Sequence, residues 1–328
     1  MRFRPTSLAA RTAPGLARRR RSLLQPIATM LILTLSLSAT LAQPVAVVTT
    51  NRSGPYGQAM QALLETLRRG APQNDVRSFD LEAGGENVGA VLTQVHQANP
   101  ALIVTVGSPA TATVLAGSWS SPIVFSMVLY PAQSGYVPGR NVTGVSLDVP
   151  LDVQFQTLRR LLPGAHRVGV LYHRTETGSV VAAARTAAAR HGFMLETKDI
   201  DQPSEVPGAL PEFLASIDAV WTVADSHVLS PQSTTALILQ ALRMWVPVFG
   251  LSSPHVELGA LAALSCDYAD VGSQSGELAL RVLKGESAAS IMPESPRKIS
   301  LALNLRSAQH LGLAIAPDVE REAQEVIR

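Results

Sequence analysis

The sequence predicts an α/β protein of two similar Rossmann-like lobes, each built on a parallel sheet. Short β-branched runs alternate with alanine- and leucine-rich helical stretches almost to the end of the chain, as βαβ units do. The pattern restarts near residue 150. The chain of 328 residues is long enough to form two separate cores. The junction at residues 146–150 is short and is not a Gly/Ser-rich linker, which indicates a hinge between the lobes, with a ligand cleft beside it.

The first set of elements opens with a buried strand and an amphipathic helix over residues 56–69, whose apolar residues share one face. Residues 102–106 form an almost continuous apolar run, as expected for a strand buried on both faces. Another helix is predicted at 88–97. The predicted strands of this set are 46–49, 76–79, 102–106, 122–127 and 142–146.

The second set begins with a helix at 151–162, which Pro163-Gly164 ends. An alanine-rich helix follows at 180–190, and a late amphipathic helix at 271–284 ends at Gly285. Two short helices close the chain. The predicted strands of this set are 168–172, 194–198, 219–223, 246–249, 261–266 and 298–304.

The N-terminal 42 residues are typical of a secretory signal peptide. Four consecutive arginines precede a short apolar run, and small residues lie before Gln43. The run is shorter than the roughly 20 residues of a spanning helix, although a membrane anchor remains the alternative. We therefore expect a periplasmic protein that is soluble after cleavage, exported by either the general or the twin-arginine route.

Removal of that segment changes the charge of the chain. Seven of the 27 basic residues lie in residues 1–42, so 20 remain against 25 acidic ones, a formal charge of −5. We therefore expect no nucleic-acid partner.

Cys266 is the only cysteine, which excludes an intramolecular disulfide and a cysteine zinc cluster. No metal ligand set or phosphate loop is recognisable, and we expect no metal and no cofactor.

Small hydroxyl residues follow the third predicted strand at a helix start. Gly107-Ser108-Pro109-Ala110-Thr111 combines free backbone N–H groups with the positive end of the helix dipole. Ser108 and Thr111 could hold a ligand carboxylate, or Ser108 could simply cap its helix. Ligands of open α/β sheets bind beyond the carboxyl ends of the strands. That rule adds the candidate ligand-binding residues Asn51, Tyr56, Ser126 and Met127.

A carboxylate follows a predicted strand of the second set. Asp225 lies just past residues 219–223, where a ligand ammonium group would need such a partner. The alternative is that Asp225 caps the following segment or faces water. If it binds the ammonium group, Asp225→Ala is expected to abolish binding and to leave stability nearly unchanged. Tyr172 and Gly250, at the ends of the strands before and after, complete the candidate ligand-binding residues.

Several segments occur in an order that resembles a known family. They are Gly107-Ser-Pro-Ala-Thr, Pro122-Ile-Val-Phe-Ser, Asn141-Val-Thr-Gly-Val, Val168-Gly-Val-Leu-Tyr, Thr222-Val-Ala-Asp, Gly259-Ala-Leu and Leu283-Lys-Gly. This series resembles the ABC-transporter substrate-binding protein family that includes tryptophan- and tyrosine-binding members. The resemblance covers residues 44 to 326.

The resemblance implies a type I periplasmic-binding-protein fold, in which two α/β lobes are joined by three crossovers and enclose the ligand. It implies aromatic amino acids among the ligands, with Ser108 and Thr111 at the carboxylate and Asp225 at the ammonium group. The chain departs from the family pattern at His173-Arg174-Thr175 and at Ser226-His227. We assign residues 44–147 and about 254–297 to one lobe, and 148–253 and about 298–328 to the other.

The expected function is that of an exported solute receptor, acting as a monomer. It would bind an amino acid or a related amine or carboxylate compound by hinge closure and deliver it to an ABC permease of the inner membrane. The alternative is a periplasmic sensor that signals to a histidine kinase. We expect no enzymatic activity, because the chain has neither a Gly-x-Ser-x-Gly elbow nor a His-Glu-x-x-His helix.

Overall fold

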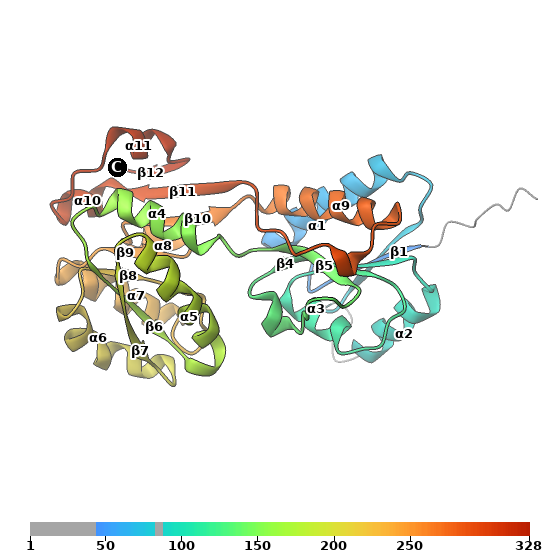
Figure 1. The fold of residues 1–328 in the computed structure, drawn as a ribbon, viewed down its shortest axis with the longest axis horizontal. Coiled ribbons are helices and arrows are strands. Elements are labelled where there is room, and N and C mark those ends of the chain that lie inside the picture. The colour runs from blue at the N-terminus through green and yellow to red at the C-terminus, as the bar shows by residue number, and fades with distance from the viewer. Residues whose placement is uncertain (1–43, 83–87) are drawn as a thin grey trace, which may run out of the picture. The chain divides into compact units, whose positions relative to one another are not determined.

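The computed structural model describes residues 44–82 and 88–328. The expected signal peptide, residues 1–42, lies outside the described residues. The α/β fold class is confirmed by the two sheets of the described chain, in which all strand pairs but one are parallel (Figure 1). None of the helices in this part of the chain has the length and apolar character needed to cross a bilayer.

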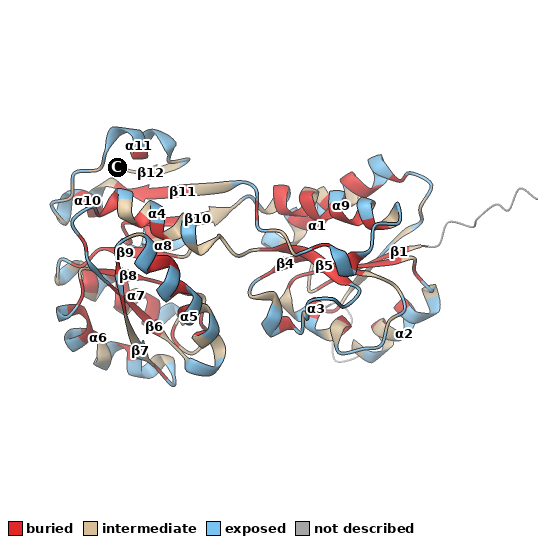
Figure 2. Cartoon of the chain, in the orientation of Figure 1, coloured by how far each residue is buried: buried red, intermediate tan, exposed pale blue. Residues whose placement is uncertain are grey.

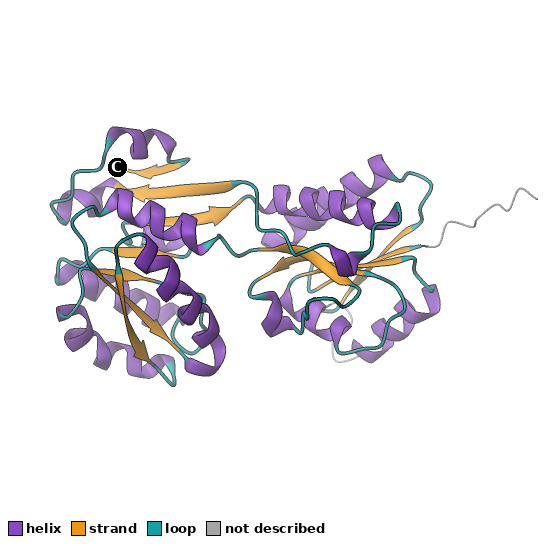
Figure 3. Ribbon diagram, viewed as in Figure 1, coloured by secondary structure: helices purple, strands orange, loops and turns teal. Residues whose placement is uncertain are grey.

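The first sheet has five parallel strands in the order β2-β1-β3-β4-β5. Its central strands are continuous apolar runs because helices cover both faces. Helices α1 and α9 pack on one face, and α2 and α3 on the other (Figure 3). The elements are β1 (Val45–Thr49), α1 (Gly54–Gly70), β2 (Val76–Asp80), α2 (Val88–Ala98), β3 (Leu102–Val106), α3 (Ser108–Leu115), β4 (Ile123–Val128), a 3-10 turn η1 (Pro131–Ser134), β5 (Val142–Ser146) and α9 (Tyr268–Leu283).

The second sheet has seven strands in the order β12-β11-β10-β9-β8-β6-β7, with β11 antiparallel to β10. Its two faces are covered by α4 and α5 and by α6 and α7. The elements are α4 (Leu151–Leu161), β6 (Arg167–Tyr172), α5 (Arg174–Arg190), β7 (Met194–Asp199), η2 (Pro203–Glu205), α6 (Val206–Ala215), β8 (Ala219–Trp221), α7 (Pro231–Arg243), β9 (Val248–Gly250), α8 (Ser253–Glu257), β10 (Ala262–Cys266), β11 (Ile299–Asn304), α10 (Leu305–His310), α11 (Pro317–Glu322) and β12 (Glu325–Ile327).

The described chain passes between the two sheets three times: from β5 to α4, from β10 to α9, and from η3 (Ala288–Ser290) to β11. The second passage differs from the sequence assignment, which began the return to the first lobe near residue 254. Strand β10 belongs to the second sheet, because it pairs with β9 and with β11, and α8 packs against these strands. The pairing of Leu264 with Leu301 joins segments far apart in the chain, which local sequence patterns do not reveal.

Helix α9 returns to the first sheet by packing tightly against α1. Gly272 and Gly276 lie one helical turn apart on the face that meets α1. A Cβ on Gly272 would lie 2.0 Å from the Ala59 carbonyl oxygen, and one on Gly276 would lie 2.8 Å from Thr66 Cβ. The missing side chains allow the two helix backbones to approach closely, and the resulting interface is buried along its length (Figure 2).

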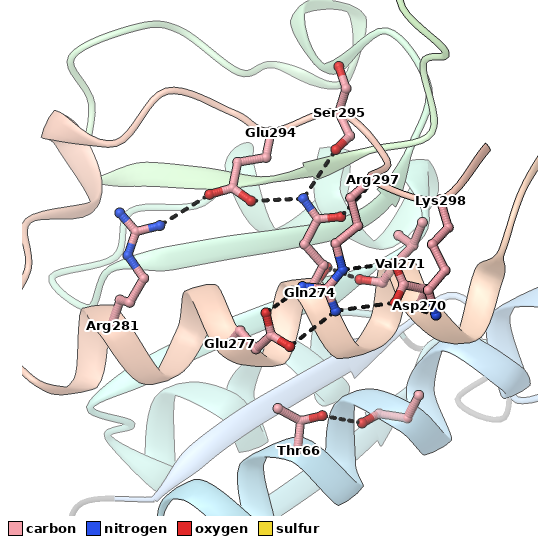
Figure 4. Close-up of polar contacts among 12 residues, drawn as sticks. Thr66, Asp270, Val271, Gln274, Glu277, Arg281, Glu294, Ser295, Arg297 and Lys298 are labelled. Carbon is pink, nitrogen blue, oxygen red and sulfur yellow. Dashed lines mark hydrogen bonds and ion pairs between the residues drawn. The ribbon is translucent and has the colours of Figure 1, made fainter.

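Ion pairs fasten the third crossover to α9 (Figure 4). Arg297 lies 2.9 Å from Asp270 and 2.7 Å from Glu277, and Gln274 donates to Glu294 at 2.8 Å. Burial opposes ionisation of Asp270, but its bonds to Arg297 and Lys298 outweigh it and hold the pKa of that carboxyl below its ordinary value. The segment that leads into β11 therefore has a defined path along α9.

Candidate ligand-binding site

A cavity of about 500 Å³ lies where segments from the carboxyl ends of several strands meet. Its volume is within the range of roughly 300–1,000 Å³ that small-molecule sites occupy. It is lined by residues that follow β4, β5, β8 and β9 and by residues of β10, α4 and α5. These are residues 129–133, 147–151, 154, 179, 180, 183, 221–224, 249–251, 264–266, 268 and 295.

Tyr130 connects three of these lining segments. It follows β4 in the left-handed conformation, with φ 48° and ψ 67°. Its backbone N–H lies 3.1 and 3.2 Å from the two carboxyl oxygens of Asp148, on the first crossover. Its hydroxyl accepts a hydrogen bond from the Ala224 N–H, after β8, at 3.2 Å. The end of β4, the crossover and the end of β8 are thus held together at the cavity.

The ionisable groups of the cavity are shifted by burial. Burial raises the pKa of Asp148 to about 6, against the opposing hydrogen bonds from Tyr130 and Ser146. Burial also raises the pKa of the Tyr130 hydroxyl well above its ordinary value and the pKa of the Cys266 thiol to about 11. Near neutral pH, the phenol and the thiol therefore remain protonated, and the carboxyl of Asp148 can carry a negative charge.

Apolar walls and one fixed amide complete the cavity. The Trp221 side chain is almost fully buried, and its indole N–H donates to the Gln154 side-chain oxygen at 2.7 Å. The Gln154 amide nitrogen in turn donates to the Val149 carbonyl at 2.7 Å. Both polar ends of Gln154 are engaged, so the tryptophan, α4 and the first crossover are fixed in relation to one another. Phe249 adds a second aromatic side chain to the lining.

Ser108, Tyr56 and Thr50 gather around Gly107 at the start of α3. Gly107 has φ +97°, and a Cβ there would lie 2.5 Å from the Thr50 hydroxyl and 2.9 Å from the Tyr56 ring. Gly107 is itself the N-cap residue, and the Thr50 hydroxyl accepts a hydrogen bond from the Ala110 N–H in the first turn of the helix at 3.3 Å. Ser108 is thus not the cap, and its hydroxyl lies at the helix start. Ser108 and Tyr56 do not line the cavity.

Thr111 supports this loop from within. Its side chain is fully buried, and its hydroxyl lies 2.9 Å from the Gly107 carbonyl, to which it donates, and 2.8 Å from the Thr105 hydroxyl. The carboxylate contact expected of Thr111 would need a hydroxyl that reaches a ligand, whereas in this structure the hydroxyl is enclosed between β3 and α3.

Three other predicted residues hold a turn or the core. Asn51 accepts a hydrogen bond from the Ser53 N–H at 3.1 Å and donates to Glu82 at 3.0 Å. Ser126 is fully buried, and its hydroxyl accepts a bond of 2.8 Å from Ser275 on α9. Met127 is also buried, with φ 60°, and packs into the core of the first sheet. None of the three lines the cavity.

Asp225 is enclosed by its own neighbours in the second sheet. Its side chain has 0% exposure. It accepts hydrogen bonds from the His173 N–H at 2.7 Å, the Thr177 hydroxyl at 2.5 Å and the His227 N–H at 2.9 Å. This arrangement corresponds to the alternative in which Asp225 organises the segment after its strand. Tyr172 packs partly buried against the core, while Gly250 does line the cavity.

The two departures from the family pattern are neighbours in space. The rings of His173 and His227 stack with centroids 3.9 Å apart, and His227 Nδ1 lies 2.6 Å from Glu176. Burial of Glu176 opposes its ionisation, but hydrogen bonds from Ser226 and His227 outweigh it and lower the pKa of this carboxyl. Glu176, Asp225 and His227 could converge on a metal ion. The carboxylate oxygens of Glu176 and Asp225 already accept hydrogen bonds from the protein, so groups of the chain itself occupy the positions that a metal ion would need.

Asp148, Gln154 and Trp221 line the cavity but were not predicted from the sequence. The rule that ligands bind after strand ends applies to Asp148, which follows β5 by two residues, as it does to Tyr130, which follows β4 by two. Trp221 lies within β8, and Gln154 is on the helix after the first crossover. A local sequence pattern contains no signal for that juxtaposition.

Two α/β units with three crossovers and a cavity at the strand ends define a type I periplasmic-binding-protein fold, as predicted. Solved structures share it. One is an ABC domain from Streptococcus pneumonia in complex with L-Trp, with 22% identity, a TM-score of 0.65, and coverage of 87% of this chain and 100% of that one. Another is a ligand-free, open substrate binding protein with adhesive properties from Clostridium difficile, with 21% identity, a TM-score of 0.73, and coverage of 88% and 99%.

The chain belongs to the family described as ABC transporter substrate binding protein, whose defining sequence pattern matches residues 58–327. A curated relative is a tyrosine-binding protein of Clostridioides difficile (strain R20291), which is 27% identical over 197 residues. The match covers 58% of this chain and 56% of that relative, so the chain spans little more than half the length of the curated protein that it matches.

Proposed function

We propose that this chain is the solute receptor of an ABC importer and that it binds an amino acid, an aromatic one in the first instance. The observation that carries the proposal is the cavity of about 500 Å³ at the strand ends of a substrate-binding fold. The ligand would be bound without chemical change and presented to a permease in the inner membrane. Family membership supports this role over that of a sensor that partners a kinase.

The chemistry of the cavity suits an aromatic amino acid. Trp221 and Phe249 lie in a largely apolar wall against which a ring could pack, while Tyr130 and Asp148 supply polar groups. The similar protein from Clostridioides difficile is named as tyrosine-binding, and the similar domain from Streptococcus pneumonia was solved with L-Trp. L-Tyr and L-Trp are therefore the first ligands to test.

The carboxylate of such a ligand would be met at the start of α3. There, the Ser108 hydroxyl and backbone N–H offer donors at the positive end of the helix dipole. The N–H groups of Ala110 and Thr111 are already used, because they donate to the Thr50 hydroxyl and to the Gly107 carbonyl. Because Ser108 does not line the cavity in this structure, the proposal includes a hinge movement that brings this helix start to the ligand. Thr111 would support the loop, and the receptor would work in the periplasm after removal of residues 1–42.

A ligand screen tests the proposal. Purified protein is heated with L-Tyr, L-Trp, L-Phe, L-Leu, ribose and adenosine, and hits are measured by calorimetry. A ligand at 100 times its dissociation constant adds about 2.7 kcal/mol to the free energy of unfolding, which raises Tm measurably. Stabilisation by an aromatic amino acid supports the proposal. Stabilisation by ribose or adenosine alone would contradict the ligand class and leave the receptor role in place.

The transport role needs a second measurement. The ligand-loaded protein is added to proteoliposomes that contain the permease and ATPase encoded beside its gene. We expect the loaded protein to stimulate ATP hydrolysis and ligand uptake. A gene neighbourhood with a histidine kinase in place of a permease, together with ligand-dependent kinase activity, would favour the sensor.

A further inference from the structure

Asp148 is the one carboxyl group among the described residues that line the cavity, and that lining contains no lysine, arginine or histidine. Hydrogen bonds from neighbouring residues fix its position. The Tyr130 N–H approaches both carboxyl oxygens, and the Asp148 N–H donates to the Ser146 hydroxyl at 3.2 Å. The carboxyl is therefore oriented by Tyr130, which follows β4, and the backbone beside it by Ser146, the last residue of β5.

The hydrogen-bonding capacity of this carboxyl is only partly used. An ionised carboxylate can accept about four hydrogen bonds, whereas the protein groups that hydrogen-bond to Asp148 are the Tyr130 N–H and the Ser146 hydroxyl. No cation is among the groups that act on its pKa. Burial without a counter-charge is costly, so a positive group brought into the cavity would be held strongly.

Asp225, by contrast, has no carboxyl oxygen that is accessible from the cavity. Its side chain is fully enclosed, and three donors from the segments after β6 and β8 occupy its oxygens. Its neighbour Ala224 lines the cavity, but Asp225 does not. A ligand ammonium group could reach it only if this network opened.

We propose that Asp148, and not Asp225, binds the ammonium group of the ligand, and that the cavity thereby selects ligands that carry a primary amine. This inference rests on the proposed function and specifies the ligand class of the same site. A ligand with only a carboxylate would place a second negative charge near Asp148 without a lysine, arginine or histidine in the lining to compensate. The contact would also be made on the first crossover, between the two sheets.

A paired-ligand experiment tests the role of Asp148. Binding of L-Tyr and of its analogue without the amine, 3-(4-hydroxyphenyl)propanoate, is measured by calorimetry at pH 7.5 for the wild-type protein, Asp148→Asn and Asp225→Asn. The wild type should prefer L-Tyr. Asp148→Asn should weaken L-Tyr by about ten- to a hundredfold, as loss of a hydrogen bond to a charged group does. The affinity for the analogue should stay the same or rise.

The control separates recognition of the amine from a structural role. Asp225→Asn disturbs the enclosed network, so it should lower Tm and leave the preference for L-Tyr over the analogue at the wild-type value. An unchanged affinity of Asp148→Asn for L-Tyr would overturn the proposal. It would equally be overturned if Asp148→Asn weakened both ligands alike, or if Asp225→Asn removed the preference instead.

Failure of the proposed function would be recognised separately. If the wild-type protein binds neither L-Tyr nor L-Trp, the proposed ligand is wrong, and the variants are compared with tyramine in place of L-Tyr. A preference for tyramine over the propanoate that Asp148→Asn removes would still support amine recognition by Asp148. Equal binding of the two probes, or binding of neither, would overturn it.

Discussion

Asp148 and Asp225 both follow a strand of a parallel sheet, yet their surroundings differ in every respect that decides a role. Asp225 is fully enclosed and accepts hydrogen bonds from His173, Thr177 and His227. Asp148 is partly buried and faces the cavity, the Tyr130 N–H and the Ser146 hydroxyl are its hydrogen-bonding partners, and burial raises its pKa to about 6. The Asp225 carboxyl is bound by groups of the protein itself, whereas the Asp148 carboxyl is accessible to a ligand.

Asp270 provides a third case that explains the difference. It is also buried, but Arg297 and Lys298 lie beside it, and despite burial its pKa falls below the ordinary value. The comparison indicates that a buried carboxyl is structural where the chain supplies donors or cations to it. Where the chain supplies neither in full, as at Asp148, a ligand can provide the missing positive charge.

The largest expected effect is the loss of stability when the enclosed carboxyl of Asp225 is removed. Asp225→Ala leaves three donors without their acceptor in a buried site, each at a cost of roughly 1 kcal/mol or more. We expect the free energy of unfolding, measured in urea, to fall by about 3 kcal/mol or more. Glu212→Ala, at an exposed position on α6, should change it by about 0.5 kcal/mol at most. Unchanged stability of Asp225→Ala would restore the purely ligand-binding role.

The next effect concerns the pH dependence of stability without ligand. Because the fold raises the pKa of Asp148, the unfolded chain binds fewer protons than the native one between about pH 4 and pH 6. The wild-type stability linked to this group is thus present at low pH and is lost as the pH rises through 6. Asp148→Asn should match the wild type near pH 4 and exceed it at pH 8 by about 1–3 kcal/mol.

Thermal unfolding of both proteins in buffers from pH 4 to pH 8 measures this difference. A variant that is less stable than the wild type at pH 8 would show that Asp148 has a stabilising partner, and the contrast with Asp225 would then disappear.

A smaller effect tests the counter-charge at Asp270. Arg297→Ala removes the ion pairs with Asp270 and Glu277 from a side chain that is 43% exposed, so screening by water limits the loss to about 1 kcal/mol. Since the pKa of Asp270 is lowered in the fold, its contribution is present at neutral pH and is lost as the pH falls.

Urea unfolding at pH 7 and pH 3 checks this, with the exposed pair of Arg190 and Asp152 as the control. Arg190→Ala should cost less than Arg297→Ala at pH 7. A loss for Arg297→Ala that is equal at both pH values would exclude Asp270 as its source.

The smallest effect distinguishes a ligand contact from a helix cap. Ser108 does not cap α3, whereas Ser230 caps α7 through a bond from the Ser233 N–H. Ser108→Ala should leave Tm unchanged and weaken a carboxylate ligand by about 1 kcal/mol. Ser230→Ala should do the reverse and cost about 1 kcal/mol of stability. The two variants are compared by thermal unfolding and by titration of L-Tyr, and an equal loss of Tm in both would contradict the assignment for Ser108.

Sequence patterns predicted the fold more fully than the site. The predicted strands at 102–106 and 142–146 coincide with β3 and β5. For β3 the reason is that a parallel strand covered on both faces is recognisable from its own apolar residues. The start of α5 at Arg174 was placed six residues too late. The tripeptide Thr177-Gly178-Ser179, whose residues are poor helix formers, masks the first turns of that helix.

The candidate residues fall into two groups: those that the strand-end rule placed correctly and those that are buried in the core. Ser108, Tyr56 and Gly250 lie where the strand-end rule places them, and whether Ser108 and Tyr56 meet a ligand stays a prediction. The same rule selected Ser126 and Met127, but both are buried, because they lie inside β4, which continues to Val128, and helices cover both faces of this sheet. The exact end of the strand was not visible in the residues themselves.

The sequence by itself determined the α/β class, the order of the elements and the resemblance to a substrate-binding family, because these depend on local periodicity and on residues close together in the chain. Only the tertiary structure decided that β10 joins the second sheet, that Asp225 is enclosed and that Asp148 faces the cavity. The donors to Asp225 include His173, 52 residues away, and the Asp148 carboxyl is held by Tyr130, 18 residues away. Burial and hydrogen-bond satisfaction are set by such distant segments, and they decide which carboxyl remains free for a ligand.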